Sequence, residues 1–503
     1  MKSNSSDTLT NQTNQKPTSK LIRKESLFKH GLDKNKIPLL IEEIEIAKNT
    51  KRVVNVENIL EKFPFADNDQ VMINPCFGDP ENRDVLGGPF LTEEAFVKTN
   101  EFCNFEDFTF QKGGPRLQIA LKPEDTVVAI CLGGALCPGC NVAVRELVMC
   151  LWFNYGVKAI WGIKFGFTGC IDEKDWISLN PDEVSDIHKK GGSILGTNRG
   201  SSLNGEAVVD MLQKKSINVL FMIGGFGTIH EMSIIKTIID KRGLQISTAC
   251  IPKTLDNDIP LIDRSFGFET SVEELVKVIG AANYEASCTP NCVAIVRAFG
   301  REAGFTALQA TNSSRDVNVC LVPEQKFNLY GEYGLLEYIF KRLKVRGHCV
   351  ILVSEGNEYS ILDKNKCEMP EKDIFGNKVY PDVGRNLRQE INDYGLKNNL
   401  DVNVKYIDPT YMIRSCPSNG FDTQYTVKLI HIAVHSIFAG FTNFTTGFIQ
   451  RKPVIIPIEY ILNAGKRKID LNKNDDYRTM MASTGQPSFN YNSSVFTKST
   501  NKA

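Results

Sequence analysis

The chain has 503 residues, of which 42% are hydrophobic and 23% are charged, as in an ordinary globular protein. Lysine and arginine together number 59, as do aspartate and glutamate, so the formal net charge is zero. A nucleic-acid partner is therefore not expected, because nucleic-acid-binding proteins carry a basic surface that replaces the counterions of the phosphates. No run of residues reaches the roughly 18 uncharged apolar positions that a membrane helix needs, so we do not expect a membrane protein.

The two ends of the chain are more polar than its middle. Residues 1–20 are rich in Ser, Thr, Asn, Gln and Lys and lack the apolar core of a secretory signal, so we predict a disordered tail there. The last three residues, Asn501-Lys502-Ala503, are not the peroxisomal signal Ser-Lys-Leu. We therefore expect a cytoplasmic protein.

The cysteines and histidines do not predict a metal or redox centre. The 14 cysteines are scattered through apolar runs, where we expect reduced, buried thiols. Cys137 and Cys140 form a CxxC pair, but without a second pair or a thioredoxin-like context we expect neither a redox nor a zinc role. The six histidines show no metal-ligand spacing, and we expect His431 and His435, four apart in an apolar helix, to be core or interface residues.

Residues 21–122 show no regular alternation of elements and are predicted to form an N-terminal extension. From Thr126 onward, short apolar runs alternate with helical patterns. This alternation predicts an α/β fold over residues 123–465, with two similar lobes that each contain a mainly parallel sheet flanked by helices. Residues 466–503 are predicted to form a C-terminal extension. The predicted strands are 126–131, 157–163, 217–223, 246–251, 292–296, 317–322 and 349–353, and the predicted helices include 142–154, 228–240, 271–285 and 333–343.

Three glycine-containing turns lie in the first half of this region. The turn 133–141 and the turn Gly224-Gly225-Phe226-Gly227-Thr228 each join a predicted strand to a helix. Glycine lets backbone N–H groups approach a phosphate, and the helix N-terminus favours its negative charge. The turn 195–200 adds Arg199, which could pair with phosphate oxygens. A plain connecting turn remains the alternative for each of them taken alone.

The fourth turn, Pro252-Lys253-Thr254-Leu255-Asp256-Asn257-Asp258, follows the predicted strand 246–251. One of its two aspartates could accept the proton of an attacking hydroxyl while the other helps to hold Mg²⁺, as phosphoryl transfer requires. An Asx-rich turn without a catalytic role is the alternative. Four such turns at the carboxyl ends of strands in one sheet favour a phosphoryl-transfer site.

Charged residues that could complete such a site follow later strands. Arg301, Lys405 and Arg414 are candidate phosphate ligands, and the fork of a guanidinium group matches phosphate oxygens. Glu355 could accept hydrogen bonds from sugar hydroxyls. Each of these residues alone is more typical of a surface or salt-bridge position.

Together these segments resemble the 6-phosphofructokinase family, in the right order over Gly114 to Pro457. The resemblance is closest to the trypanosome-like ATP-dependent branch, which carries features of the pyrophosphate-dependent enzymes. It implies a phosphofructokinase-like fold and the ATP-dependent phosphorylation of fructose 6-phosphate to fructose 1,6-bisphosphate in glycolysis. The segments similar to that branch are 114–116, 133–141, 252–258, 411–414 and 484–489.

The resemblance implies roles for the matching residues. Asp256 would be the general base for the 1-hydroxyl of fructose 6-phosphate, Arg301 would stabilise the moving phosphoryl group, and Asp258 would help to hold Mg²⁺. Gly227 favours ATP because pyrophosphate users carry aspartate there, whereas Lys253 resembles the pyrophosphate users. ATP would be bound by Gly133, Arg199, Gly200, Gly224, Gly225, Phe226, Gly227 and Thr228, and the sugar phosphate by Thr254, Leu255, Asp256, Phe299, Gly300, Arg301, Glu355, Lys405, Tyr411, Met412, Ile413 and Arg414.

One residue departs from the family pattern in a way that bears on catalysis. The family turn reads Gly-Gly-Asp-Gly-Thr, and Phe226 replaces the aspartate that helps to bind Mg²⁺, a cation that takes oxygen ligands. Asp258 could keep a partial metal site, and Glu231 is a conceivable substitute ligand. Phe299 replaces a methionine and should be a mild change. The resemblance thus leaves two alternatives, an active kinase or a catalytically weakened or inactive regulatory member of the family.

The resemblance also carries expectations about assembly. Enzymes of this family are usually tetramers whose sites share residues between subunits, so we expect a homotetramer, or a hetero-oligomer with an active paralogue. Allosteric regulation is expected on the same ground.

Overall fold

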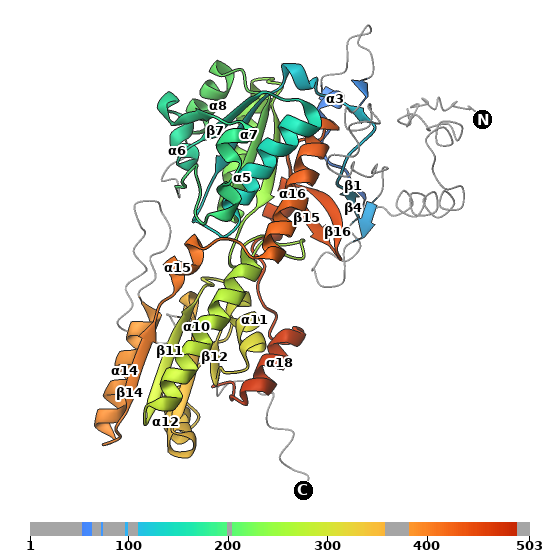
Figure 1. The fold of residues 1–503 in the computed structure, drawn as a ribbon. Helices are drawn as coiled ribbons and strands as arrows, with labels where there is room; N and C mark the ends of the chain where they lie inside the picture. Colours follow the sequence, from blue (N-terminus) through green and yellow to red (C-terminus); the bar gives the residue numbers. More distant parts are fainter. Residues whose placement is uncertain are drawn as a thin grey trace, which may run out of the picture. The chain divides into compact units, whose positions relative to one another are not determined.

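The computed structural model describes residues 53–62, 72–73, 96–98, 109–198, 204–357 and 382–489. Within this part of the chain, strands form a sheet of ten strands, a sheet of four and a separate pair, and the two larger sheets have helices on both faces (Figure 1). The predicted α/β fold with helix-flanked, mainly parallel sheets is confirmed, although the two sheets differ in size. No helix in the described ranges is both long and apolar enough to cross a bilayer.

The large sheet is parallel at its centre and contains antiparallel pairs toward both sides, although the outermost pair on one side is parallel. In order across the sheet, its strands are β1 (Val53–Val54), β4 (Thr109–Lys112), β16 (Lys452–Pro457), β15 (Phe444–Ile449), β10 (Ser247–Pro252), β9 (Val219–Gly224), β6 (Val127–Leu132), β7 (Ala159–Ile163) and β8 (Trp176–Ser178), and β3 (Phe96–Lys98) pairs with β4. Every residue of β9 and β10 is buried. Strands covered on both faces have no polar alternation, which explains why the sequence reads as continuous apolar runs.

Alternate residues of the central strands pack against opposite layers of helices. On β6, Val128 and Ile130 contact the core under one layer, whereas Ala129 and Cys131 contact the core under the other. The first layer contains α5 (Cys140–Met149), which continues as the π-helical turn η4 (Cys150–Tyr155), and α16 (Gly420–Phe438). The second layer contains α8 (Gly205–Lys214), α9 (Phe226–Lys241) and α17 (Ile458–Ala464). Shorter helices are α3 (Ile59–Lys62), η3 (Pro123–Asp125), α6 (Gly166–Cys170), η5 (Glu173–Asp175), α7 (Pro181–Val184) and η6 (Ile187–Lys189).

The small sheet is parallel throughout. Its strand order is β12 (Val319–Leu321), β13 (His348–Ser354), β11 (Cys292–Ala298) and β14 (Asn403–Ile407). Helices α10 (Phe268–Cys288) and α11 (Phe305–Ser314) pack on one face, and α12 (Leu335–Arg346) and α14 (Val383–Lys397) on the other. Strand β13 ends in the short helix η7 (Glu355–Asn357), and β2 (Met72–Ile73) pairs separately with β5 (Gln118–Ile119).

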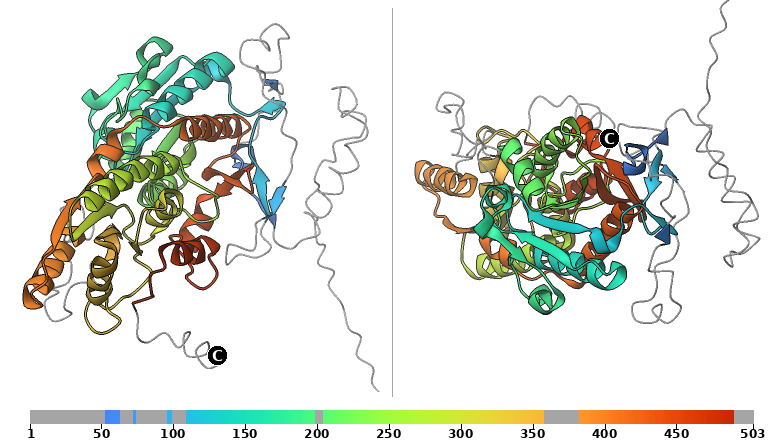
Figure 2. Two further views of the ribbon diagram at one scale, coloured as in Figure 1. Left: turned by 60° about the horizontal axis from the view of Figure 1, so that its bottom comes forward. Right: turned by 90° about the horizontal axis from the view of Figure 1, so that it is seen from above.

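The chain crosses from the small sheet back to the large one after β14, through α15 (Thr410–Ser415) and α16. Strand β16 then pairs with β4, so two segments far apart in the sequence lie side by side (Figure 2). Helix α18 (Asp475–Thr484) packs on α11 of the small-sheet lobe. Beyond it, the Gln486 side chain accepts from the Cys320 amide at 2.6 Å and donates to the Cys320 carbonyl at 3.0 Å. The residues that directly follow α18 are thus bound to β12 through the Gln486 side chain.

Candidate active site

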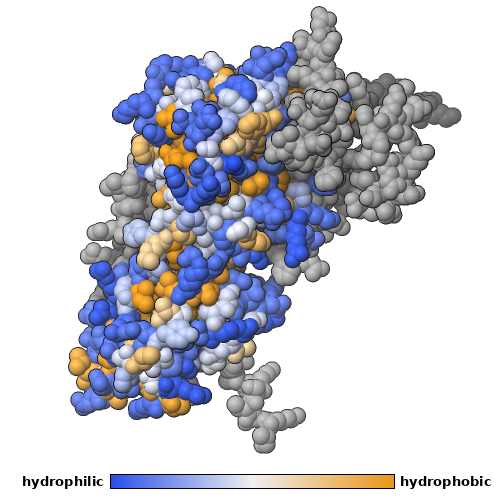
Figure 3. Space-filling model, viewed as in Figure 1, coloured by the Kyte–Doolittle hydropathy of each residue, from blue (hydrophilic) through white to orange (hydrophobic). Residues whose placement is uncertain are grey.

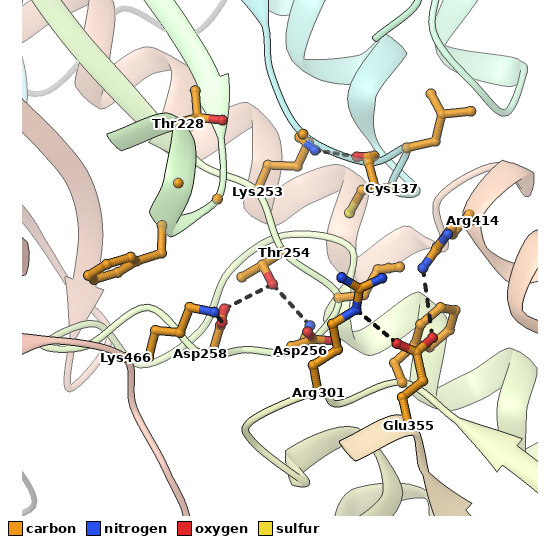
Figure 4. A pocket seen from close by; sticks show the side chains of 18 of the residues that line it. Cys137, Thr228, Lys253, Thr254, Asp256, Asp258, Arg301, Glu355, Arg414 and Lys466 are labelled. Atoms are coloured by element: carbon orange, nitrogen blue, oxygen red, sulfur yellow. Dashed lines mark hydrogen bonds and ion pairs between the residues drawn. The ribbon is translucent and has the colours of Figure 1, made fainter. Parts of the chain in front are cut away.

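The carboxyl ends of strands from both sheets meet at a cavity of about 330 Å³ (Figure 4). The turns after β6, β9 and β10 of the large sheet form one side, and the segments after β11 and β13 of the small sheet form the other. Arg414 of α15 and Lys466, which follows α17, complete the lining. Ligands of open α/β sheets bind at this end of the strands.

Glycine is required where β6 and β9 approach helix α9. A Cβ added at Gly133 would lie 2.5 Å from Thr228 Oγ1, and one at Gly224 would also overlap the Thr228 side chain. These two glycines do not line the cavity, whereas Gly134, which has a positive φ of 78°, does. The Lys253 ammonium group donates a hydrogen bond to the carbonyl of Ala135 and so ties this turn to β10.

Helix α9 begins at Phe226, and its first turn lines the cavity with Phe226, Gly227 and Thr228. This turn contains no acidic residue, so no side-chain carboxylate offsets the positive potential of the helix N-terminus. Phe226 is partly buried and packs against the core under α9. A Cβ added at Gly227 would meet nothing within 4 Å, so packing does not require glycine there. Glu231, further along α9, lines the cavity as well, and burial raises its pKa to about 7.

The turn after β10 is held by its own polar side chains. The Asp256 amide donates to Thr254 Oγ1 at 3.0 Å, and the Thr254 hydroxyl donates to Asp258 Oδ1 at 3.1 Å. Asn257 adopts a positive φ of 52°, and its Oδ1 accepts from the Ser265 amide at 3.1 Å. This Asx-type bonding holds both aspartates at the cavity (Figure 4).

Asp256 has the electrostatic properties of a general base. Burial raises the pKa of its carboxyl to about 7, and the neighbouring carboxylates of Asp258 and Glu355 act in the same direction, while Arg301 and Arg414 oppose the rise. A carboxyl group with this pKa can accept a proton near neutral pH.

Lys466 brings a positive charge to the second aspartate of the turn. Its Nζ lies 3.9 Å from Asp258 Oδ2 and 3.1 Å from Glu302 Oε1. Burial lowers the pKa of Lys466, but the two carboxylates outweigh this effect and raise the pKa overall. Burial also raises the pKa of Asp258, and Lys466 counteracts the rise.

Glu355 organises the arginines on the small-sheet side. Its carboxylate is 5% exposed and accepts from Arg301 Nε at 3.1 Å. Arg297 lies 3.3 Å from the other carboxylate oxygen, and Arg414 lies 3.9 Å from it. The Arg414 guanidinium also lies 5.6 Å from the ring centre of Phe299, so an aromatic face supports it. Arg301 and Arg414 both line the cavity and can present N–H groups to an anion (Figure 4).

A second cavity of about 490 Å³ shares Arg414 with the first. Tyr411 and Asn198 also line it. Two predicted ATP ligands, Arg199 and Gly200, follow Asn198 directly but lie outside the described residues.

Other predicted site residues do not line either cavity. Lys405 lies on β14, where its ammonium group is 3.4 Å from the carboxylate of Glu285. Met412 is 72% exposed and Ile413 is buried. Gly300 adopts a φ of 114° and approaches Ala303 closely, which is a backbone role. The first cavity gathers the predicted Gly225, Phe226, Gly227, Thr228, Thr254, Leu255, Asp256, Asp258, Phe299, Arg301, Glu355 and Arg414.

Lys466 is the functional candidate that sequence reasoning missed. It follows α17 in a polar segment without a recognisable motif. Only the path of the chain brings it to Asp258, which lies about two hundred residues earlier in the sequence.

Comparisons with known proteins agree on one family. Residues 127–437 match the family described as Phosphofructokinase. The chain is 42% identical over 380 residues to "ATP-dependent 6-phosphofructokinase 7" of Arabidopsis thaliana, covering 76% of this chain and 77% of that protein. It is 38% identical to "ATP-dependent 6-phosphofructokinase" of Borreliella burgdorferi, covering 79% and 91%. The crystal structure of a pyrophosphate-dependent phosphofructokinase from Marinobacter aquaeolei shares the fold with a TM-score of 0.58 at 17% identity, covering 71% of this chain and 91% of that one.

Proposed function

Because this chain belongs to the phosphofructokinase family, we propose that it transfers a phosphoryl group from ATP to the 1-hydroxyl of fructose 6-phosphate. The observation that carries the proposal is the position of Asp256. This carboxyl group, with a pKa of about 7, lines one cavity together with the turn at the start of α9 and with Arg301 and Arg414. A base, an anion cradle and guanidinium groups in one cavity are the parts that phosphoryl transfer needs.

The phosphates of ATP would lie against the turns of the large sheet. Gly134, Gly225 and Gly227 expose backbone to the cavity, and the N-terminus of α9 favours a negative charge there. Lys253 is 3% exposed and lines the cavity beside these turns, where its positive charge favours the phosphates. The open space at Gly227 supports ATP over pyrophosphate as the donor, since an acidic side chain at this position would occupy that space.

Fructose 6-phosphate would lie against the turn after β10 and the arginines. Asp256 would accept the proton of the 1-hydroxyl as that oxygen attacks the phosphorus atom. Arg301 would balance the charge that develops on the transferred group. Glu355 holds Arg301 through a hydrogen bond and lies close to Arg414, so its role would be to orient both guanidinium groups.

Mg²⁺ would neutralise phosphate charge when it binds together with ATP. It usually needs only one or two carboxylates besides the phosphates and water. Two carboxylates other than the base fit this requirement, because Asp258 and Glu231 both line the cavity. Phe226, at the start of α9, offers no oxygen ligand, and the Lys466 ammonium group competes for Asp258.

A second candidate function follows from Phe226. The chain would then bind nucleotide and sugar phosphate but turn over slowly or not at all, as a regulatory member of the family. The glycine turns, the arginines and the base are all retained at the cavity, so loss of one metal ligand would reduce catalysis more than binding.

The two alternatives are separated by an assay with ATP, Mg²⁺ and fructose 6-phosphate. We expect weak turnover, and we expect Phe226→Asp to raise it by about tenfold or more by supplying a carboxylate to the metal. Gly227→Asp is the matched variant, because it adds the same charge one residue away and should weaken ATP use. Robust wild-type turnover that Phe226→Asp leaves unchanged would contradict the argument about the metal ligand, and preference for pyrophosphate would contradict the choice of donor.

We also propose self-association, with a homotetramer as the first expectation. Figure 3 shows hydrophobic patches on both lobes, set in a mainly hydrophilic surface. Phe153, Tyr284 and Phe421 are all at least half exposed, at 61%, 75% and 50%. Assembly with an active paralogue, allosteric control, a cytoplasmic location and membership of the trypanosome-like branch stay predictions from the sequence.

A further inference from the structure

Away from the active site, three side chains with metal-binding atoms meet between α5 and α16. Cys150, His431 and His435 each place one ligand atom within 4.8 Å of the others. In the described part of the chain, this is the one group of three or more His, Cys, Asp or Glu residues with that geometry. None of the three lines either cavity of the active site.

The elements that carry these residues pack against each other. Helix α16 lies along α5 (Figure 1). His431 and His435 are four residues apart, so their imidazoles lie on one face of α16, and this spacing is the one by which a helix supplies two histidines to zinc. Cys150 is the first residue of the π-helical turn η4, which continues α5. Turns of this kind are frequent at functional sites.

His435 has one ring nitrogen held and the other without a partner. The side chain is 2% exposed, and its Nδ1 lies 2.7 Å from the Tyr155 hydroxyl oxygen. No described residue forms a hydrogen bond with its Nε2. Other buried side-chain atoms of the described residues also have no partner, but this one is a ring nitrogen beside two further metal-binding side chains, where an ion can satisfy it.

Tyr155 is itself fixed in place. Its ring stacks on Phe438 with centroids 3.9 Å apart and planes at 16°, and its hydroxyl faces His435. Metal-binding histidines usually donate their second ring N–H to an acceptor, which sets the tautomer and the ring orientation, and the Tyr155 hydroxyl oxygen can be that acceptor.

We propose that Cys150, His431 and His435 bind one Zn²⁺ ion. Thiolate and imidazole are the ligands that zinc prefers, and three protein ligands leave a fourth position. Glu146 lies one turn before Cys150 with its carboxylate 4.0 Å from His431 Nε2, but it also pairs with Arg145 and is not part of the group whose ligand atoms meet. Ligand atoms of a tetrahedral zinc site lie roughly 3.3–3.6 Å apart, so the side chains would need to move by about 1 Å.

The His431 side chain is 40% exposed, which provides a route for the ion from solvent. A bound ion would tie α5 to α16.

Metal titration of the full chain tests the proposal without reference to activity. Protein freed of metal by a chelator is titrated with Co²⁺ and then with Zn²⁺, and absorption spectra are recorded. We expect one Co²⁺ per chain, with a thiolate-to-cobalt charge-transfer band and the visible bands of tetrahedral cobalt, and displacement by Zn²⁺. Absence of the charge-transfer band in the wild-type protein would overturn the proposal.

Three variants assign the ligands. Cys150→Ser and His431→Ala should abolish the charge-transfer band, and Tyr155→Phe should weaken Zn²⁺ binding by roughly tenfold. Cys288→Ser is the matched control, because Cys288 is an exposed thiol at the end of α10. The band should survive this change. His431 is partly exposed, so His431→Ala should fold even if Cys150→Ser does not. A band that persists in His431→Ala, or that is lost equally in Cys288→Ser, would contradict the assignment.

Discussion

Replacing Asp256 with asparagine tests its proposed role as the general base. The variant keeps the size of the side chain and its place in the turn after β10 but cannot accept a proton. A general base contributes about 10²–10⁴-fold to rate, which corresponds to roughly 2.7–5.4 kcal/mol of transition-state stabilisation. We therefore expect kcat/KM of Asp256→Asn to fall by at least about a hundredfold.

The pH profile gives an independent measure of the same group. Because burial raises the pKa of Asp256 to about 7, the carboxylate is the active form only above that pH. With this pKa, kcat/KM at pH 7 should be about half of its plateau value, and at pH 6 about a tenth of it. The profile is measured by a coupled spectrophotometric assay at low fructose 6-phosphate, in Phe226→Asp if wild-type turnover is too weak.

Stability provides the internal control for this experiment. A carboxyl group whose pKa is higher in the folded than in the unfolded state destabilises the fold when it ionises. For Asp256 this destabilisation is absent below the unfolded pKa of 3.8 and complete above about pH 7. Asp256→Asn should therefore be more stable than wild type at pH 8 while it is less active. A flat kcat/KM between pH 6 and pH 8, or a variant that keeps a tenth of wild-type activity, would refute the role of Asp256.

Three further outcomes follow from particular contacts. Lys466→Met removes a cation near Asp256, the proposed general base, and should move the acidic limb of the profile to higher pH. Lys468→Met, at an exposed position, should leave the profile in place. Glu231→Gln should stabilise the protein by about 1–2 kcal/mol at pH 8 and not at pH 4. The rise of the Glu231 pKa from 4.5 to about 7 corresponds to about 3.4 kcal/mol for a fully buried group, and the partial exposure of this side chain reduces that value. Gln486→Ala leaves the backbone groups of Cys320 without their side-chain partner and should cost about 1–3 kcal/mol in urea unfolding.

The central strands of both sheets could be predicted from the sequence, because strands buried on both faces are continuous apolar runs. The predicted strands 217–223 and 246–251 correspond to β9 and β10 within a residue or two. The edge strand β12 was predicted as 317–322, whereas β14, β15 and β16 were not predicted. On β14 the residues are exposed, half-buried or buried in no regular order, and β15 and β16 pair antiparallel to each other, outside the β–α alternation that the prediction followed.

Residues of the candidate active site could be predicted where they occur in short motifs. The turn 252–258 lines the cavity with Lys253, Thr254, Leu255, Asp256 and Asp258. Lys466 could not be found in this way, because its partner is distant in the sequence. The same holds for the proposed zinc site, whose histidines were expected to be core or interface residues. Their four-residue spacing indicates a metal site only together with Cys150, which the fold brings beside them from the other helix.

The charged groups of the cavity indicate how Phe226, at the start of α9, affects phosphate binding and metal binding. Four carboxylates and four basic groups line the cavity: Glu231, Asp256, Asp258, Glu355, Lys253, Arg301, Arg414 and Lys466. A phenylalanine in place of an aspartate removes a negative charge from a helix N-terminus, so the attraction of this turn for phosphates is not weakened. The substitution removes an oxygen ligand for the metal, and Asp258 already has the Lys466 ammonium group nearby. Metal-assisted stabilisation is needed most in the transition state, whereas in the proposed site the glycine turns and the arginines would bind the substrates. The substitution should therefore lower kcat with little change in the KM for ATP, and restoring aspartate at this position should reverse that pattern.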